Sequence, residues 1–283
     1  MDKTKEQELR TLAAQIRIKT IHAMAGAGGG HIGGSMSIAD VLAVLYGSVM
    51  RYDPQQPRWE DRDRLVLSKG HCGPALYATL ALSGFFPEEM LKTLNKGGTR
   101  LPSHCDRLKT PGIDMTTGSL GQGVSCAAGI AFALKKKGSA AHVYAIVGDG
   151  ELQEGQVWEA VQFAAHQVLD NFTIIVDSNH LQLDGTLESI CRPFSLEEKL
   201  RAFGLCAHSA CGYDVRAVQE ALEWSRDTAG CCAVVLDSIK GIGCDFAEKA
   251  DFCHYMLFGD AEAAAAEAEI LRRLEAGVVK GEN

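Results

Sequence analysis

Two apolar runs in the middle of the chain are each followed by residues that can bind a metal. Val143–Val147 leads into Gly148-Asp149-Gly150-Glu151, and Phe172–Asp177 leads into Ser178-Asn179. Asp149 and Asn179 are thirty positions apart, which suits one strand–helix–strand crossover. A carboxylate, an amide oxygen and a nearby main-chain carbonyl are hard ligands for Mg²⁺ or Ca²⁺, and diphosphate oxygens and water can complete the coordination. The spacing therefore predicts a site for a cation and a phosphate ligand.

The simpler interpretation is that Asp149 caps the following helix and Asn179 makes a turn, as Asp and Asn often do. Either residue alone favours that interpretation. Their joint position on one strand–helix–strand unit favours the metal site instead.

Three histidines lie near glycines or proline in the first part of the chain. His31 lies in the glycine-rich segment 28–35, His71 follows Ser68-Lys69-Gly70, and His104 follows Pro102-Ser103. Segment 28–35 is expected to be too rich in glycine to continue a helix, which leaves its backbone free to approach a ligand closely. Each histidine alone fits a surface or structural role, whereas a group of imidazoles could exchange protons near neutral pH.

A further glycine-rich segment, Gly118-Ser119-Leu120-Gly121-Gln122-Gly123, precedes a predicted helix. It does not fit the G-x-G-x-x-G dinucleotide pattern, and no strand clearly precedes it. The segment is therefore either an ordinary helix entry or a contact for another ligand, and a nucleotide-binding oxidoreductase is disfavoured.

The elements that must position these residues follow from the apolar pattern. Short apolar runs predict three buried parallel strands, Val143–Val147, Phe172–Asp177 and Ala233–Ile239. An apolar face over Glu154–Leu169 predicts the helix between the first two. Further helices are predicted over Glu6–Met24, Ile38–Tyr46, Gly73–Leu82, Gly123–Lys136, Ser195–Arg201 and Ala261–Leu274.

This alternation predicts an α/β fold, doubly wound, with a mainly parallel sheet and helices on both faces. Residues 1–260 are expected to form one domain, and residues 261–283 a C-terminal helix and tail. The longest irregular stretch is expected at Asn95–Thr117, and long loops in compact domains are often functional.

Composition narrows the class of protein. The 283 residues are 46% hydrophobic and 23% charged, which is typical of a soluble globular protein. A net charge of -8 and the short run Lys135–Lys137 disfavour nucleic acid as a partner. No signal segment and no apolar run of membrane-spanning length is expected, which predicts a cytoplasmic protein. The ten scattered cysteines are interpreted as reduced, small hydrophobic residues.

Together the motifs resemble those of thiamine diphosphate (ThDP) enzymes, and of transketolases in particular. The resemblance rests on the segment Gly148 to Gly185, which includes Gln153, Trp158-Glu159-Ala160 and Asp184-Gly185, and on the order of the three histidine motifs ahead of Leu120-Gly121-Gln122-Gly123. The match at Lys240-Gly241-Ile242-Gly243 and His254 is looser, and Ile32 stands where many transketolases carry proline. The resemblance covers about residues 10 to 255, which correspond to only the first portion of a full-length transketolase.

The resemblance implies roles for individual residues. Metal ligands would be Asp149, Asn179 and the carbonyl of Leu181. The cofactor would contact Gly118, Ser119, Leu120, Gly148, Asp149, Gly150, Glu154, Asn179 and Lys240. Catalytic roles would fall to His31 and His104 at the donor sugar, His71 near the diphosphate, and His254.

The resemblance also implies a function. The protein would use ThDP with Mg²⁺ (or Ca²⁺) to transfer a two-carbon ketol unit between sugars or sugar phosphates. By this resemblance the domain that binds the cofactor's pyrimidine would lie on another chain, so a C-terminal transketolase subunit carrying it is the expected partner, in an α2β2 assembly. The alternatives are a subunit of another ThDP enzyme, such as a 2-oxoacid dehydrogenase α chain or a deoxyxylulose phosphate synthase relative, and a non-catalytic regulatory homologue. The donor and acceptor sugars stay open.

Overall fold

A five-stranded parallel sheet forms the centre of the molecule in the computed structural model, which describes residues 1–183 and 185–281. Its strand order is β1-β2-β3-β7-β6, and every neighbouring pair is parallel. The strands are β1 (Arg64–Leu67), β2 (Val143–Gly148), β3 (Phe172–Ser178), β6 (Cys206–Cys211) and β7 (Cys232–Asp237). A separate antiparallel hairpin joins β4 (Leu181–Gln182) and β5 (Gly185–Thr186).

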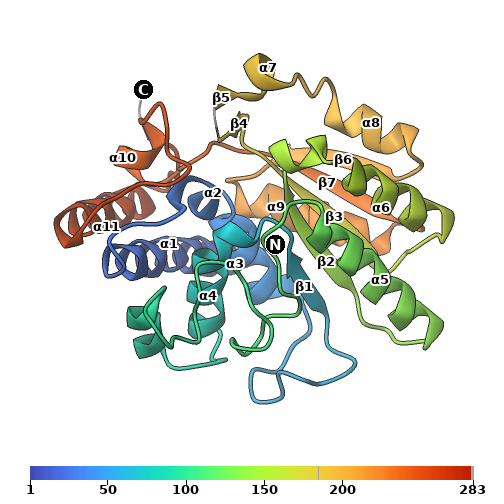
Figure 1. Ribbon diagram of the computed structural model, residues 1–283, viewed down its shortest axis with the longest axis horizontal. Coiled ribbons are helices and arrows are strands. Elements are labelled where there is room, and N and C mark those ends of the chain that lie inside the picture. The colour runs from blue at the N-terminus through green and yellow to red at the C-terminus, as the bar shows by residue number, and fades with distance from the viewer. Residues whose placement is uncertain (184, 282–283) are drawn as a thin grey trace.

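Helices connect and cover the strands, as Figure 1 shows. The α-helices are α1 (Lys3–Ala25), α2 (Ile32–Met36), α3 (Ala39–Val44), α4 (Gly73–Leu82), α5 (Gln122–Lys136), α6 (Gly155–His166), α7 (Leu187–Ile190), α8 (Leu196–Ala202), α9 (Val215–Asp227), α10 (Asp245–Glu248) and α11 (Asp260–Glu275). Shorter turns are the π-helical η1 (Leu45–Val49) and the 3-10 helices η2 (Gly70–Cys72), η3 (Glu88–Thr93) and η4 (Gly150–Gln153).

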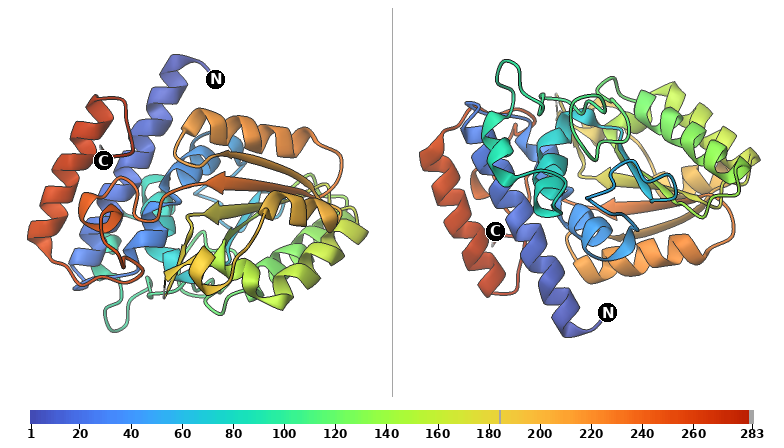
Figure 2. Two further views of the ribbon diagram at one scale, coloured as in Figure 1. Left: turned by 90° about the horizontal axis from the view of Figure 1, so that it is seen from above. Right: turned by 90° about the horizontal axis from the view of Figure 1, so that it is seen from below.

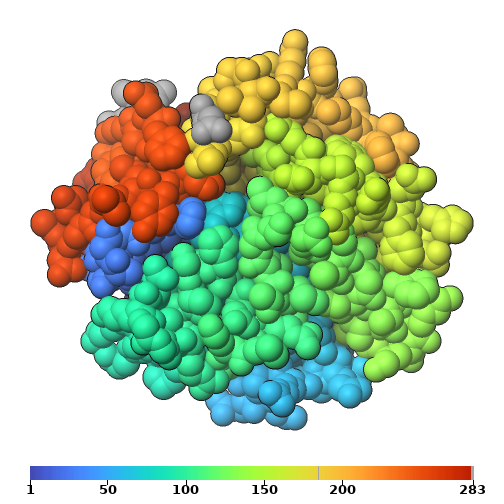
Figure 3. Space-filling view, in the orientation of Figure 1, coloured from blue at the N-terminus to red at the C-terminus, as the bar shows by residue number. Residues whose placement is uncertain are grey.

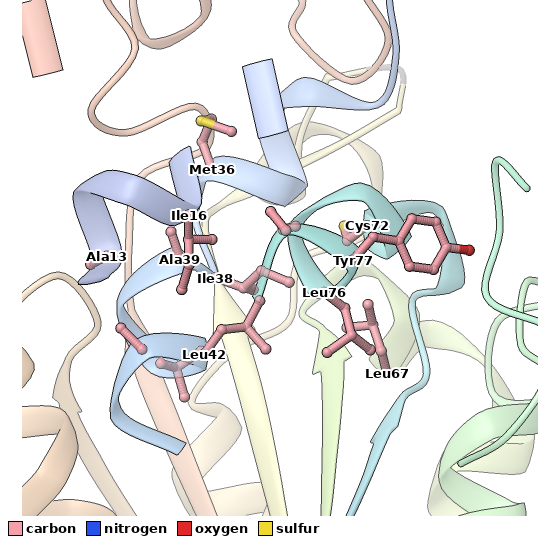
Figure 4. Packing of buried hydrophobic residues seen from close by; sticks show 14 of the residues in the cluster. Ala13, Ile16, Met36, Ile38, Ala39, Leu42, Leu67, Cys72, Leu76 and Tyr77 are labelled. Atoms are coloured by element: carbon pink, nitrogen blue, oxygen red, sulfur yellow. The ribbon is translucent and has the colours of Figure 1, made fainter. Parts of the chain in front are cut away.

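The two faces of the sheet pack into two separate cores, because successive strand side chains point to opposite faces. Alternate residues of β2, including Val143 and Ala145, pack with α5, α6 and α8. Tyr144 and Ile146 pack with α3, α4 and α9 on the other face. Figure 4 shows part of this second core, with Leu76 beside Leu67 and with Leu42 among the buried residues. The predicted doubly wound fold with helices on both faces is confirmed.

The predicted elements largely match those observed. The three predicted strands and the helix between the first two are present, although the third strand ends at Asp237. Segment 94–121 contains no helix or strand, in line with the predicted irregular stretch. Strands β1 and β6 and helix α9 were not predicted, since β1 is only four residues long and β6 is an edge strand with a polar sequence.

The expectation that segment 28–35 is not helical is wrong in its second half. Helix α1 ends at Ala25 and a turn follows, but α2 begins at Ile32 and includes two glycines. All five residues of α2 are buried, so packing overrides the low helix propensity of glycine. A side chain at Gly33 would place its Cβ 2.6 Å from the carbonyl oxygen of Cys253, and glycine alone permits that approach.

The C-terminal helix α11 lies along α1 in both views of Figure 2. It buries Ala263, Ala266 and Ile270, and the Arg273 guanidinium pairs with Glu248 at 2.7 Å. The expectation that no apolar run approaches membrane-spanning length was too strong. Segment Ile32–Val49 is long and apolar enough to cross a membrane by length and composition, but 83% of it is buried inside the protein, where it forms part of the core.

All ten cysteines are free thiols, in agreement with the predicted reduced state, and six of them are buried.

Candidate active site

A cavity of about 350 Å³ opens at the carboxyl ends of the central strands. Figure 3 shows a hollow where the yellow, orange and green segments meet. Its lining includes thirteen of the predicted site residues: His31, His71, His104, Gly118, Leu120, Gly148, Asp149, Gly150, Glu154, Asn179, Leu181, Lys240 and His254. Ser119 lies on the same loop but is exposed and does not line the cavity. Asp184 of the predicted motif lies outside the described residues.

Strands β2 and β3 bring Asp149 and Asn179 together. Gly148 is in register with Asp177, and the Asp149 amide donates to the Asp177 carbonyl at 3.1 Å. Both strands end at this point, so the residues that follow them face the same space at the edge of the sheet. The prediction that these strands are neighbours is confirmed.

The Asp149 carboxylate is almost fully buried. It accepts hydrogen bonds from the amides of Gly150 at 2.8 Å and His180 at 2.6 Å. The bond to Gly150 caps η4, so the helix-capping role that was the simpler interpretation of Asp149 is also present. Burial and the neighbouring Asp177 carboxylate nevertheless raise the Asp149 pKa to about 6. A bound cation would offset both effects, because it favours the charged carboxylate.

Asp177 links several buried polar groups beneath Asp149. Its Oδ2 accepts hydrogen bonds from Lys69 Nζ at 2.5 Å, Ser37 Oγ at 2.6 Å and Asn179 Nδ2 at 2.7 Å. Burial alone would lower the Lys69 pKa, but the Asp177 carboxylate raises it above its usual value. The Asp177 carboxylate thereby fixes the amide group of Asn179.

The main-chain carbonyl of Leu181 completes the oxygen donors. It accepts a 3.2 Å hydrogen bond from Lys240 Nζ, and the Asn179 Oδ1 accepts from the Leu181 amide at 3.2 Å. The second bond stabilises a turn after Asn179, which was the simpler interpretation of that residue. Lys240 thus places a positive charge at the cavity wall, beside the oxygens that would face a cation and an anionic ligand.

This donor set fits Mg²⁺ held jointly by protein and phosphate. No group of three or more His, Cys, Asp or Glu side chains in the described residues is placed to hold a metal. One carboxylate, one amide and one carbonyl leave coordination positions for phosphate oxygens and water, as Mg²⁺ prefers. The glycine at 150 keeps this wall open, because a Cβ there would lie 3.1 Å from Gln182 Cβ.

Four histidines from distant segments form one cluster at the cavity. The ring centroid of His31 lies 5.3 Å from that of His71, 5.6 Å from His104 and 5.2 Å from His254. Tyr255 also contacts His31, at 5.0 Å between ring centroids. The looser sequence match at His254 therefore leads to the same cavity as the other three.

Burial holds these imidazoles neutral at pH 7. Burial is the largest cause for all four, with nearby positive charge adding to it at three of them. It lowers the pKa of His31 and His254 to about 4 and that of His71 to about 2, and it also lowers that of His104. Lys69 contributes at His71, and Lys240 at His31 and His254. Each neutral ring presents one hydrogen-bond donor and one acceptor, which suits sugar hydroxyl groups.

Backbone contacts between loops hold the cluster in place. The Gly30 and Met256 amides and carbonyls pair as a β-bridge, and the Gly33 amide donates to the Cys253 carbonyl at 2.9 Å. These bonds fix His31 against the segment that carries His254. A Cβ at Gly118 would lie 3.2 Å from the His104 ring, so glycine there lets the 118–121 loop approach this histidine.

Two charged residues of this site, Lys69 and Glu151, were not predicted from the sequence. Lys69 pairs with Asp177, and Glu151 accepts from the Gly121 amide at 2.8 Å and the Gly148 amide at 3.1 Å. Glu151 thereby ties the loop that carries Gly118 to the end of β2. Each lies just beyond an apolar strand, where burying an unpaired charge costs free energy. A charged residue directly after an apolar run therefore indicated a paired, buried charge in the sequence.

The comparison with protein families agrees with this geometry. The family described as transketolase, thiamine diphosphate binding domain, matches residues 9–271. The chain belongs to this family. The predicted membership, and the binding of ThDP by this domain type, are confirmed.

Similar proteins include separate transketolase subunits. The chain is 47% identical over 264 residues to a 6-deoxy-6-sulfo-D-fructose transketolase subunit of a Clostridium species, covering 93% of this chain and 96% of that protein. It is 38% identical to an apulose-4-phosphate transketolase subunit of Actinobacillus succinogenes, covering 93% and 95%. This transketolase chain therefore has the length of such subunits.

Solved transketolases are longer. The structure of transketolase from Campylobacter jejuni superposes with a TM-score of 0.87 at 30% identity, covering 99% of this chain and 44% of that one. The chain thus spans less than half the length of that transketolase.

Proposed function

We propose that this chain is the cofactor-binding subunit of a two-subunit transketolase that transfers a two-carbon ketol unit from a ketose to an aldose. The observation that carries the proposal is the single cavity in which Asp149, Asn179 and the Leu181 carbonyl face the four-histidine cluster. One end offers hard oxygen donors for a cation, and the other offers neutral imidazoles for sugar hydroxyls. This combination suits a diphosphate cofactor bound next to a polyhydroxylated substrate.

The chain's residues would hold the cofactor in the following way. Asp149, Asn179 and the Leu181 carbonyl bind Mg²⁺, while Gly148, Gly150, Glu154 and Lys240 surround the diphosphate. Bound thiamine diphosphate supplies the nucleophilic carbon and the electron sink that cleavage of a ketose requires. Gly118 and Leu120 line the same cavity on the loop that Glu151 anchors, where the thiazolium ring would lie, and Ser119 flanks them.

The histidine cluster would bind and orient the sugar. His31 and His104 hydrogen-bond the donor hydroxyls, and His71 and His254 lie beside His31. Because all four pKa values are lowered, each ring can accept a proton from a hydroxyl only transiently and returns to the neutral form. Such rings can orient a substrate through hydrogen bonds without adding a positive charge to the site.

Activity would require a partner chain. This chain has the length of separately encoded transketolase subunits. It covers only 44% of the Campylobacter jejuni transketolase chain. The partner would carry the pyrimidine-binding domain and close the cavity from outside, in an α2β2 assembly.

The donor is proposed to be a ketose with an anionic end group. The Clostridium and Actinobacillus relatives carry names that specify a sulfonated and a phosphorylated sugar. The higher identity, 47% against 38%, makes 6-deoxy-6-sulfo-D-fructose the first donor to test.

The test is reconstitution with the product of the neighbouring transketolase-like reading frame. Calorimetry measures ThDP binding with Mg²⁺, and ketol transfer to an aldose phosphate is assayed with sulfofructose, apulose 4-phosphate and xylulose 5-phosphate as donors. Turnover by the pair, with none by either chain in isolation, supports the proposal. Ketol transfer by this chain in isolation contradicts the partner requirement, and absence of ThDP binding by the pair contradicts the cofactor.

A further inference from the structure

A second cavity, lined by many positively charged side chains, lies at the amino-terminal end of β1, whereas the candidate active site lies beyond the carboxyl end of that strand. The volume of this second cavity is about 460 Å³, and it lies between segments 57–64 and 100–114. Six cationic side chains line it, together with one carboxylate, Asp114. The cations are Arg58, Arg62, Arg64, Arg100, Arg107 and Lys109, and we call the cavity that they line the arginine pocket. The concentration is notable in a protein of net charge -8, which repels anions at long range.

The arginine pocket is separate from the candidate active site. Arg64 begins β1, whereas Lys69 and His71 follow its carboxyl end and line the first cavity. The two cavities have no lining residue in common. An anion in the arginine pocket would therefore lie in a different cavity from the candidate active site.

Little of this charge is neutralised within the protein. Asp114 pairs with the buried Arg62 and lies 3.7 Å from Arg64. The Arg64 guanidinium otherwise donates to neutral carbonyls, those of Trp59 at 3.1 Å and Glu60 at 2.9 Å. Burial, and after it the Arg62 charge, lower the Arg64 pKa, whereas the Asp114 carboxylate acts to raise it.

The outer cations are still less compensated. Arg100 donates from Nε to the Lys109 carbonyl at 2.9 Å, which fixes it beside the loop without neutralising it. Lys109 lies 3.7 Å from Asp106 at an exposed position. Within the described residues, the side chains of Arg58 and Arg107 form no hydrogen bond or ion pair. Their guanidinium groups are thus available to a ligand.

We propose that the arginine pocket binds a small molecule with a tetrahedral oxyanion group, a phosphate ester or a sulfonate. Guanidinium groups match such oxyanions through paired N–H donors, and they line this pocket from two separate segments of the chain, 57–64 and 100–114. The cavity, of about 460 Å³, is large enough for a small ligand that carries such a group. Arg62 and Arg64 form the fixed inner wall, and Arg58 and Arg107 close on the ligand from outside.

The test uses inorganic phosphate and methanesulfonate as probes, titrated into the full chain while the arginine Nε–H resonances are followed by NMR. The variant Arg58→Ala/Arg107→Ala removes two exposed cations without breaking any internal bond. We expect phosphate affinity to fall by about tenfold or more, since charge-assisted hydrogen bonds are lost. Lys136→Ala/Arg192→Ala removes the same charge elsewhere and should leave the affinity unchanged.

Lys240→Ala is titrated in parallel, because phosphate can also enter the first cavity. A signal that survives in Lys240→Ala and is lost in Arg58→Ala/Arg107→Ala supports the arginine pocket. Response to phosphate alone identifies a phosphate ester as the ligand class, and response to both probes identifies oxyanions in general. Unchanged affinity in Arg58→Ala/Arg107→Ala, or no response to either probe, overturns the proposal. Binding of a glutamate-rich peptide without binding of either probe overturns it in favour of an acidic protein partner.

Discussion

The amide nitrogen of Asn179 donates a 2.7 Å hydrogen bond to the Asp177 carboxylate. This contact determines which end of the Asn179 side chain can face the cavity, because the nitrogen is engaged below and only the oxygen remains as a metal ligand. The same carboxylate holds the buried Lys69 ammonium at 2.5 Å. Asp177 is therefore a positioning residue for the metal site, and Lys69 is its buried ion-pair partner.

Replacing both partners separates positioning from stability. Lys69→Met alone should destabilise the fold by about 3–5 kcal/mol, because it leaves a buried carboxylate unpaired. Lys69→Met/Asp177→Leu removes both charges and should recover most of that loss. Mg²⁺ affinity in the assembled enzyme should still fall by about 10–100-fold, since Asn179 is no longer oriented. Urea unfolding and a calorimetric Mg²⁺ titration measure the two effects. Wild-type Mg²⁺ affinity in the double variant would show that Asp177 has no positioning role.

Direct loss of the ligating carboxylate should have a larger effect on cofactor binding. Asp149→Ala is expected to abolish Mg²⁺-dependent ThDP binding, because the diphosphate charge is left uncompensated. Asp170→Ala is the matched control, since Asp170 is exposed, lies just before the amino-terminal end of β3 and so away from the cavity, and pairs with Lys135. Calorimetry on both variants decides the assignment. Equal ThDP affinity in Asp149→Ala and Asp170→Ala would exclude Asp149 as a ligand.

The sequence predicted the fold and the candidate site to different depths. The buried strands β2, β3 and β7 were recognisable because both faces of a central parallel strand are apolar. The edge strand β6 lacks this pattern, and β1 is too short to show it. Helix α9 did carry a signal, with Asp214 as N-cap and an apolar stripe from Val215 to Leu222, so this helix was predictable although it was not predicted.

At the site, local motifs identified residues but not their mutual contacts. His31, His71, His104 and His254 were each predicted from short segments. The contacts that bring His254 to His31, the β-bridge between Gly30 and Met256 and the hydrogen bond between Gly33 and Cys253, became visible in the structure. The Lys69–Asp177 pair joins residues 108 positions apart, and no local pattern encodes such a contact. Ionic pairs of this kind become visible only once β1 and β3 are placed in one sheet.

The glycine at position 118 should be required for the loop to approach His104. A Cβ there would lie 3.2 Å from the His104 ring, so Gly118→Ala should push the loop and the histidine apart. We expect ThDP affinity of the assembled enzyme to fall by about tenfold, with the unfolding free energy of this chain changed by less than about 1 kcal/mol. Gly129→Ala is the control within α5, where a Cβ meets no atom within 4 Å. It should stabilise the chain by up to about 1 kcal/mol and leave binding unchanged. Unaltered affinity in Gly118→Ala would contradict the assigned role.

A buried histidine far from the cavity should make the fold sensitive to acid. His142 hydrogen-bonds Thr173 Oγ1 at 2.8 Å, and burial, aided by Arg226, lowers its pKa from 6.5 to about 4. Because the unfolded chain binds this proton more readily, the stabilisation is complete above pH 6.5 and is lost as the pH falls toward 4. The loss should be about 3 kcal/mol for this one group. Urea unfolding of His142→Gln between about pH 8 and 4.5 should give a correspondingly shallower curve. The exposed His166→Gln should keep the wild-type slope, and parallel wild-type and His142→Gln curves would show that His142 does not contribute.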